Sequence, residues 1–142
     1  MKNEIQYDRD RACKFALSSL SHSDSSKKAL YNKLILKGFS KEDAAFAIEY
    51  VTSYGYVDEK RQIERIATDL CERQNIGKKK IFARLLSKGY RQSDVSEVIS
   101  SLVRDGRINF ELARARLLQK YPSDITEEQR KKILFKNGYT DV

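Results

Sequence analysis

A six-residue phrase that ends on glycine and an aromatic residue occurs three times in this chain. Its copies occupy residues 34–39, 85–90 and 134–139. Gly89 follows Gly38 by 51 residues, and Gly138 follows Gly89 by 49. Recurrence at a period this long marks a repeated supersecondary unit, which buries its apolar face by stacking on neighbouring copies. The chain is therefore predicted to bind along an extended surface and not within one central pocket.

The segments between these glycines carry a helical period. Only one proline, Pro122, is present, and no stretch alternates polar and apolar residues over several positions. Glycine after each apolar run suits the left-handed position that ends a helix. The predicted buried faces consist of Ala12, Phe15, Ala16 and Leu20; Leu30 and Leu34; Ala44, Ile48 and Val51; Ile63, Ile66, Ala67 and Leu70; Ile81 and Leu85; Val95, Ile99 and Leu102; Phe110, Ala113, Leu117 and Tyr121.

Capping residues mark where several helices begin. The run 21–26 offers several N-cap residues, and two further pairs fit or approach the capping-box pattern: Ser40 with Asp43, and Thr126 with Gln129. Arg91 stands where Ser40 stands one repeat earlier, so the signal there is weaker. Ser93 is predicted to cap that helix a turn later.

These signals predict an all-α protein of tandem three-helix repeats, stacked into an elongated, curved monomer of about eight helices. The first repeat with its N-terminal segment spans residues 1–60, the second 61–109 and the third 110–142. The third is expected to be incomplete, because the chain ends soon after Gly138 and Tyr139, where its last helix would begin.

The charge of the chain is positive and unevenly spread. Lys and Arg number 28 against 20 Asp and Glu, a net charge of +8. Residues 1–60 hold 10 basic and 9 acidic groups, whereas residues 61–142 hold 18 and 11. Such asymmetry favours a partner of opposite charge, either nucleic acid or an acidic protein surface. No apolar run approaches the ~18 residues of a membrane span, and no secretory signal is visible, so a cytoplasmic protein without membrane contact is expected.

Basic residues recur at matching distances before the repeated glycines. By this register Lys27, Lys28, Lys33 and Lys37 correspond to Lys78, Lys79, Arg84 and Lys88. The candidate binding face is completed by Lys80, Lys131, Lys132 and Lys136. Such a helix face can lie against phosphates or an acidic groove, although a run of charge is more often a solvated surface.

Five tyrosines lie at predicted helix ends: Tyr54, Tyr56, Tyr90, Tyr121 and Tyr139. They can stack on bases of single-stranded nucleic acid. Packing at turns, with the hydroxyl in water, is the commoner role and the favoured interpretation.

The sequence offers no catalytic, metal or cofactor motif. Cys13 and Cys71 are isolated within helical patterns and are predicted to be core residues without a disulfide. Together with one histidine, His22, they give no metal-ligand spacing. The run from His22 to Ser26 is explained by helix capping, because catalytic triads converge from separate elements. The protein is therefore predicted to be no enzyme and to use no cofactor.

The order of these motifs resembles the RecX family, the bacterial regulators of the RecA recombinase. The resemblance runs from residue 10 to the end of the chain and rests on segments 16–20, 26–39, 55–58 and 76–89. The chain differs from the usual family pattern at Ser23, Ala29, Glu59 and the pair Gln62-Ile63.

The resemblance implies binding in the helical groove of the RecA–single-stranded DNA filament. There the family limits filament growth and suppresses ATP hydrolysis, strand exchange and the coprotease activity behind the SOS response. The basic residues named above are then the candidate contacts to the filament, with single-stranded DNA as a second candidate partner. The alternative is a protein that binds DNA directly through helix-turn-helix-like units.

Overall fold

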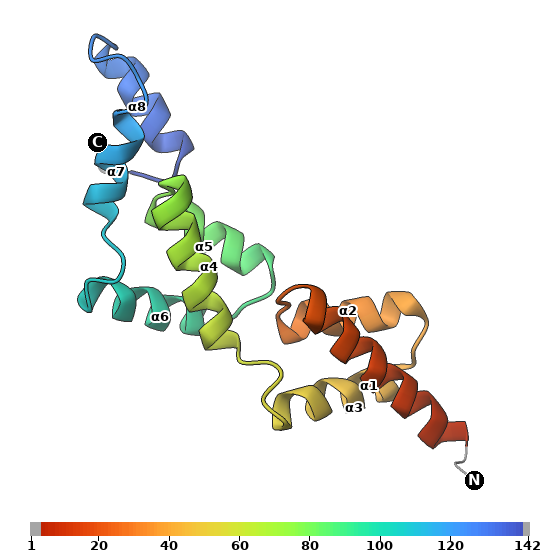
Figure 1. Ribbon diagram of the computed structural model, residues 1–142. Coiled ribbons are helices and arrows are strands. Elements are labelled where there is room, and N and C mark those ends of the chain that lie inside the picture. Colours follow the sequence, from red (N-terminus) through yellow and green to blue (C-terminus); the bar gives the residue numbers. More distant parts are fainter. Residues whose placement is uncertain (1–3, 141–142) are drawn as a thin grey trace. The chain divides into compact units, whose positions relative to one another are not determined.

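Residues 4–140 are described by the computed structural model, and they form eight α-helices and no strand (Figure 1). The helices are α1 (Glu4–His22), α2 (Lys27–Lys37), α3 (Lys41–Ser53), α4 (Glu59–Gln74), α5 (Lys78–Ser87), α6 (Gln92–Arg104), α7 (Phe110–Leu118) and α8 (Glu127–Lys136). The prediction of an all-α protein is confirmed. None of these eight helices is long and apolar enough to cross a membrane.

The helices group into two compact units. The first contains the chain up to Gln62 together with the turn Lys88–Tyr90. The second contains Ile63–Ser87 and the chain from Arg91 onward. Helix α4 begins in the first unit and continues into the second.

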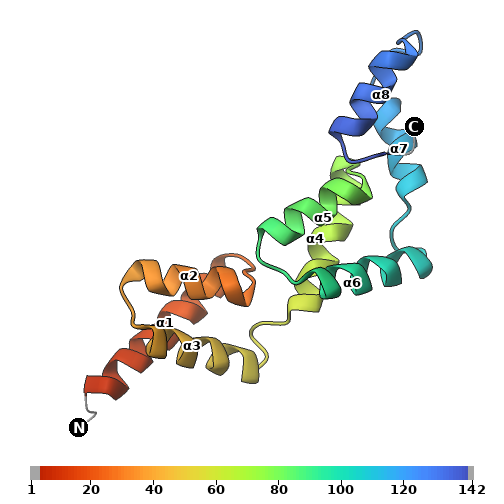
Figure 2. The same cartoon turned by 180° about the vertical axis from the view of Figure 1, so that it is seen from behind.

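In the first unit, α1 packs mainly on α3, and α2 packs against both, as Figure 2 shows from behind. Small side chains permit close approach of the α1 and α3 axes, since interaxial distance follows the size of the residues at the contact. The buried core consists of Ala12, Cys13, Ala16, Leu30, Leu34, Ala44, Ala47, Val51 and Val57. The predicted faces of these helices are thus the buried ones, with Phe15, Leu20 and Ile48 partly buried at their edges.

In the second unit, the core draws on every helix from α4 to α8, and α7 and α8 lie side by side in both views (Figures 1 and 2). Its largest fully buried side chains are Ile63, Ile81, Leu85, Ile99, Leu102 and Leu134. The predicted extension of α7 to Tyr121 is wrong, because α7 ends at Leu118. Pro122 follows, and a residue before proline is disfavoured in helical conformation.

Side-chain caps hold several helix starts as predicted. Ser26 Oγ accepts a hydrogen bond from the Ala29 N–H at 3.1 Å, and Ser40 caps α3 in the same way. The capping box opening α8 is present in full. The prediction that Ser93 caps α6 is wrong: the helix begins at Gln92, without a side-chain cap. The buried face of α6 sets where this helix begins, and packing outweighs a weak local signal.

The repeated glycines adopt the backbone conformation that the sequence predicts. Gly38, Gly89 and Gly138 have φ angles of 108°, 96° and 93°. After α2, the Gly38 N–H donates to the Ile35 carbonyl and the Phe39 N–H to the Leu34 carbonyl, so carbonyls left free at the helix end are satisfied.

The later copies of this turn do more than end a helix. In the first unit, the turn Lys88–Tyr90 packs against the start of α2, where Ser26 Oγ donates to the Lys88 carbonyl at 2.6 Å. A Cβ placed on Gly89 would lie 2.7 Å from Ser26 Oγ. A Cβ on Gly38 would meet nothing within 4 Å. Gly89 is therefore required twice, once for its φ angle and once for close packing.

The third copy of the turn docks on the start of α5 inside the second unit. The Gly77 N–H donates to the Asn137 carbonyl at 2.7 Å, and the Lys79 N–H donates to the Gly138 carbonyl at 3.3 Å. A Cβ on Gly138 would lie 2.7 Å from the Lys80 backbone nitrogen and 2.9 Å from the Gly77 carbonyl oxygen. Each later phrase thus closes one helix and braces the second helix of the repeat before it.

A buried asparagine organises the second unit. Asn75 follows α4 with a φ of 56°, in the left-handed region that asparagine tolerates better than most residues. Its Oδ1 accepts a hydrogen bond from Arg116 Nε at 2.8 Å, and its carbonyl accepts one from the Tyr139 hydroxyl at 2.9 Å. Asn75 therefore ties the end of α4 to α7 and to the third glycine turn.

The tyrosines at helix ends divide into two groups, which corrects the expectation that their hydroxyls lie in water. Tyr54, Tyr56 and Tyr121 are exposed. Tyr90 and Tyr139 are buried, and the Tyr90 hydroxyl donates to Gln62 Oε1 at 2.6 Å. Burial raises the pKa of Tyr139 to about 12. The buried pair lies in the two docked turns, where hydroxyl groups without water require a protein partner.

Both cysteines are buried and free, as the sequence predicts. Burial raises the pKa of the Cys13 and Cys71 thiols. A raised pKa leaves little thiolate at neutral pH, so both residues serve as small apolar packing groups.

Candidate functional site

The lysines at the start of α2 lie in mixed surroundings. Lys27 forms an ion pair with Glu59, with 3.8 Å between Nζ and Oε1. Lys28 is exposed. The charge of this pair, which corresponds in the repeat register to Lys78 and Lys79, is thus partly neutralised inside the first unit.

Farther along α2, the predicted basic residues contact their own unit. Lys33 Nζ donates to Ser25 Oγ at 3.0 Å. Lys37 Nζ lies 5.8 Å from the centre of the Phe15 ring, within the range of a cation–π contact. Both lysines remain exposed, so their charges face solvent while their contacts fix where they point.

The first turn of α5 presents the least compensated basic group. Lys78 and Lys79 are exposed, while Lys80 is half-buried beside the docked glycine turn. Arg84, one turn after Lys80, is half-buried. Lys88 follows the end of α5, belongs to the first unit and is exposed. Of the basic residues of α5, Lys78 and Lys79 are therefore the pair most open to a partner.

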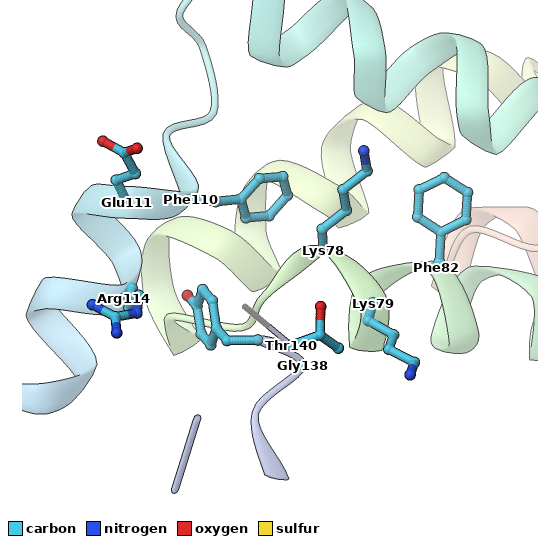
Figure 3. A pocket seen from close by; sticks show the side chains of 9 residues that line it. Lys78, Lys79, Phe82, Phe110, Glu111, Arg114, Gly138 and Thr140 are labelled. Carbon is cyan, nitrogen blue, oxygen red and sulfur yellow. The ribbon is translucent and has the colours of Figure 1, made fainter. Parts of the chain in front are cut away.

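Lys78 and Lys79 line a cavity of about 480 Å³ in the second unit (Figure 3). The cavity lies between α5, α7 and the third glycine turn and is open to solvent. Its lining residues are Lys78, Lys79, Phe82, Phe110, Glu111, Arg114, Gly138, Tyr139 and Thr140. In the view of Figure 3, Lys78 lies between the rings of Phe110 and Phe82. Basic and aromatic groups therefore meet in one concavity.

The charge at this cavity is positive. The lining contains three cations, Lys78, Lys79 and Arg114, and one carboxylate, that of Glu111. In Figure 3 the Glu111 carboxylate points away from the lysines. Within residues 4–140, no carboxylate forms an ion pair with any of the three cations. Lys79 Nζ also lies 5.9 Å from the ring centre of Phe135, an exposed residue of α8.

The equivalent positions of the first unit line a cavity as well. Lys27, Lys28 and Tyr31 stand at the same distances before Gly38 as Lys78, Lys79 and Phe82 before Gly89. The first-unit cavity, of about 530 Å³, is a shallow depression between α2 and α3. It includes Glu49 among its lining residues, and Lys27 is engaged by Glu59, so its positive charge is largely balanced.

The third repeat does not continue the lysine register. Glu127 and Glu128 occupy the positions of the lysine pair. Lys132 forms an ion pair with Glu128 at 3.7 Å on the solvent-exposed face of α8. Lys131 and Lys136 are exposed on the same helix, outside the cavity lining.

Sequence reasoning missed the aromatic and arginine members of the second-unit cavity. The repeat register contained a signal for Phe82, because it matches Tyr31. Nothing local indicated Phe110 and Arg114, which reach the cavity from α7, more than 20 residues after Lys88. Their role depends on how the turn at Gly138 docks.

Among residues 4–140, no cluster of histidine, cysteine, aspartate or glutamate has the composition of a metal site. The cavity in the second unit is instead lined by cations, aromatic rings and one outward-pointing carboxylate. This arrangement is suited to binding an anionic group next to a flat apolar group.

Three curated relatives, each named Regulatory protein RecX, are similar in sequence. The protein from Clostridioides difficile (strain 630) is 31% identical over 118 residues, which are 83% of this chain and 54% of that protein. That from Clostridium tetani (strain Massachusetts / E88) is 28% identical over 90 residues, or 63% and 41% of the two chains. That from Clostridium botulinum (strain Alaska E43 / Type E3) is 26% identical over 130 residues, or 87% and 60%. The chain spans about half the length of these relatives.

Solved structures agree on the fold. The crystal structure of RecX from Lactobacillus salivarius superposes with a TM-score of 0.77 at 17% identity, covering 94% of this chain and 90% of that one. A second crystal structure, of a regulatory protein RecX, gives a TM-score of 0.74 at 15% identity and covers 99% and 76%. No protein-family model matches the chain. In its glycine-punctuated helices, its related sequences and its fold, the chain is similar to proteins of the RecX family.

Proposed function

We propose that this chain is a regulator of the RecA recombinase that binds the RecA–single-stranded DNA filament and inhibits its ATPase, strand-exchange and coprotease activities. The protein would thereby modulate recombinational repair and the SOS response. Similarity in sequence and in fold to proteins named RecX is the observation that carries this proposal. A filament of protein on DNA presents both acidic side chains and phosphates, which are partners for the basic surface of this chain.

Within the chain, Lys78 and Lys79 are the contacts we favour. They are exposed on the first turn of α5, and no carboxylate among residues 4–140 neutralises them. Exposed charges at an interface chiefly increase the association rate and make binding sensitive to salt. Lys131 and Lys136 on α8 are secondary contacts, and Lys132 is weakened as a contact by its ion pair with Glu128.

The direct test is the ATPase activity of RecA on single-stranded DNA while this protein is titrated in. We expect hydrolysis to fall as the protein approaches the concentration of RecA binding sites on the filament. Full ATPase activity at stoichiometric protein would refute the proposed inhibition.

A charge-reversal pair tests the location of the contact. Lys78→Glu with Lys79→Glu should weaken inhibition, whereas Lys80 is left unchanged because its backbone and Cβ pack on the docked turn. The matched control is Lys14→Glu with Lys41→Glu, which makes the same change in net charge at exposed positions of the first unit. Equal loss of inhibition in both variants would show a general charge effect and not a contact at α5.

Direct DNA binding remains the second candidate function, favoured by the net charge of +8. It predicts tight binding to duplex DNA without RecA, with an affinity that falls steeply as salt rises, because each phosphate contact releases counterions. Weak binding to duplex DNA at physiological salt, together with inhibition of the filament, would exclude this alternative.

A further inference from the structure

We infer that the cavity of the second unit binds one unpaired nucleotide, with the base against Phe82 and Phe110 and its phosphate on Lys78, while Lys79 and Arg114 add positive charge at the edges of the cavity. This inference goes beyond regulation of a filament, because it assigns a nucleic-acid contact to a defined site in the chain. It concerns the second unit by itself and does not depend on the arrangement of the two units.

The aromatic groups are placed to receive a base. Phe82 on α5 and Phe110 on α7 are both half-buried in the lining, so each keeps part of its ring accessible while packing holds the rest. Rings held in this way present a flat apolar face without much loss of freedom on binding. Stacking on such faces is how proteins bind single-stranded nucleic acid with little regard for sequence.

The charged groups make the cavity attractive to a phosphate from several sides, because Lys78 and Lys79 point in opposite directions in Figure 3 and Arg114 lies across the cavity. Lys78, Lys79 and Arg114 border the same cavity, and the one carboxylate in the lining, Glu111, points away from the lysines (Figure 3). Ammonium and guanidinium groups bind a phosphate more strongly than a neutral ligand. A ligand that combines a flat apolar ring with a phosphate therefore satisfies both parts of the lining.

The size and shape of the cavity favour an unpaired nucleotide. At about 480 Å³, it lies within the range of roughly 300–1,000 Å³ that small-molecule sites occupy. In a duplex the faces of the bases are stacked on their neighbours, so they cannot reach Phe82 or Phe110 without being extruded. Single-stranded DNA or RNA offers accessible bases at a lower energetic cost.

An acidic peptide is the competing ligand, and the lining suits it less well. A peptide brings backbone N–H and C=O groups that need hydrogen-bond partners when they are buried. Besides the cations, the side chains of the lining that offer polar atoms are Glu111, Tyr139 and Thr140. Glu111 points outward and the Tyr139 hydroxyl is already bound to Asn75, which leaves few partners for a peptide backbone.

The first unit contains a natural control. Its cavity has the equivalent Lys27, Lys28 and Tyr31, but Lys27 pairs with Glu59 and Glu49 joins the lining. It therefore lacks both the second aromatic ring and the excess of positive charge. We expect nucleotide binding in the second unit and not in the first.

The test is fluorescence anisotropy of a labelled oligothymidylate of about ten nucleotides with the full chain, in the absence of RecA. Phe82→Leu should weaken binding by roughly tenfold, because stacking on a ring typically contributes that much per base. The matched variant, Tyr31→Leu, should leave binding unchanged. Circular dichroism of both variants checks that the helices are retained.

Salt dependence supplies a second, independent measurement. Lys78→Ala should lower the slope of log affinity against log salt by about 0.7, the value for one phosphate contact on a single strand. Lys14→Ala, at an exposed position on α1, should leave the slope unchanged. If Phe82→Leu proves unstable, the comparison of Lys78→Ala with Lys14→Ala still decides the matter.

Three outcomes would overturn the inference. One is equal affinity for the oligothymidylate and for a duplex of the same length, and another is an equal effect of Phe82→Leu and Tyr31→Leu. The third is displacement of the oligothymidylate by a short acidic peptide containing phenylalanine at a lower concentration than by unlabelled oligothymidylate, which would make the site a peptide site. These results are separate from inhibition of RecA, which can succeed or fail in the ATPase titration on its own.

Discussion

Replacement of Gly138 by alanine tests the double role of the third glycine turn. The backbone at Gly138 has a φ of 93°, and an added Cβ would lie 2.6 Å from Lys80 Cβ and 2.7 Å from the Lys80 backbone nitrogen. Gly38 has a similar φ of 108° but open space around its Cβ position. Gly38→Ala therefore isolates the backbone effect, and Gly138→Ala adds the steric effect.

The expected costs follow from these two terms. Left-handed backbone costs an alanine about 1–2 kcal/mol, which is the whole effect expected for Gly38→Ala. Overpacking against atoms that cannot move freely adds about 1–3 kcal/mol, so Gly138→Ala should destabilise the second unit by about 2–5 kcal/mol. Each kcal/mol lowers the Tm of a unit this small by about 4–8 °C.

Gly77→Ala completes the comparison. An added Cβ there would lie 2.6 Å from the Gly138 carbonyl oxygen, and Gly77 does not have a positive φ. Its cost should thus come from the steric term alone. Because the two glycines share one contact, the double variant should cost less than the sum of the single variants.

Urea denaturation followed by circular dichroism gives the change in the free energy of unfolding. Hydrogen exchange then locates the change, which should fall in α5, α7 and α8 for Gly138→Ala and in α1 to α3 for Gly38→Ala. Equal losses for Gly38→Ala and Gly138→Ala, or full additivity of Gly77→Ala and Gly138→Ala, would refute the docking of the turn on α5.

Three further predictions concern buried polar groups and thiols. Asn75→Gly should destabilise the protein by about 1.5–3 kcal/mol, because the hydrogen bond from Arg116 is lost. Asn75→Ala should cost about 1–2 kcal/mol more, because alanine resists the positive φ at this position; equal urea midpoints for the two variants would contradict this strain. Burial raises the pKa of Tyr139 to about 12 from 10.0, so the contribution of Tyr139 to stability is complete below pH 10 and is lost as pH rises toward 12. Urea midpoints measured from pH 9 to 11.5 should therefore decline less in Tyr139→Phe than in the unaltered protein, and an equal decline would show that another group titrates. Cys13 and Cys71 should react with a thiol reagent such as DTNB only as the protein opens, so rapid labelling of the native protein would contradict their burial.

Much of the fold could be predicted because its signals are local. The apolar residues of α5 and α6, for example Ile81, Leu85 and Ile99, sit at helical spacing and are all fully buried. Gly38 ends α2 with the positive φ that its place after an apolar run predicts. Helix periodicity and capping depend on residues within about four positions of each other, so one sequence contains the information.

The tertiary structure changed the interpretation of the basic residues. The register treats Lys27 and Lys78 as equivalent, yet Lys27 pairs with Glu59 while Lys78 borders a cavity with Phe110. The difference arises from side chains that belong to other helices. Equivalent residues of a repeat occupy the same place on their helices, but the side chains around them can differ from one repeat to the next.

The sequence by itself determined the helices, their glycine stops and the register that pairs one repeat with the next, because each depends on contacts between residues close in the chain. Only the tertiary structure decided that Gly77 and Gly138 meet where neither has room for a Cβ, that Asn75 joins α4 to α7, and that rings and cations meet in one cavity. These features bring together groups 28 to 64 residues apart, and such contacts form only when the later turn docks on the earlier helix.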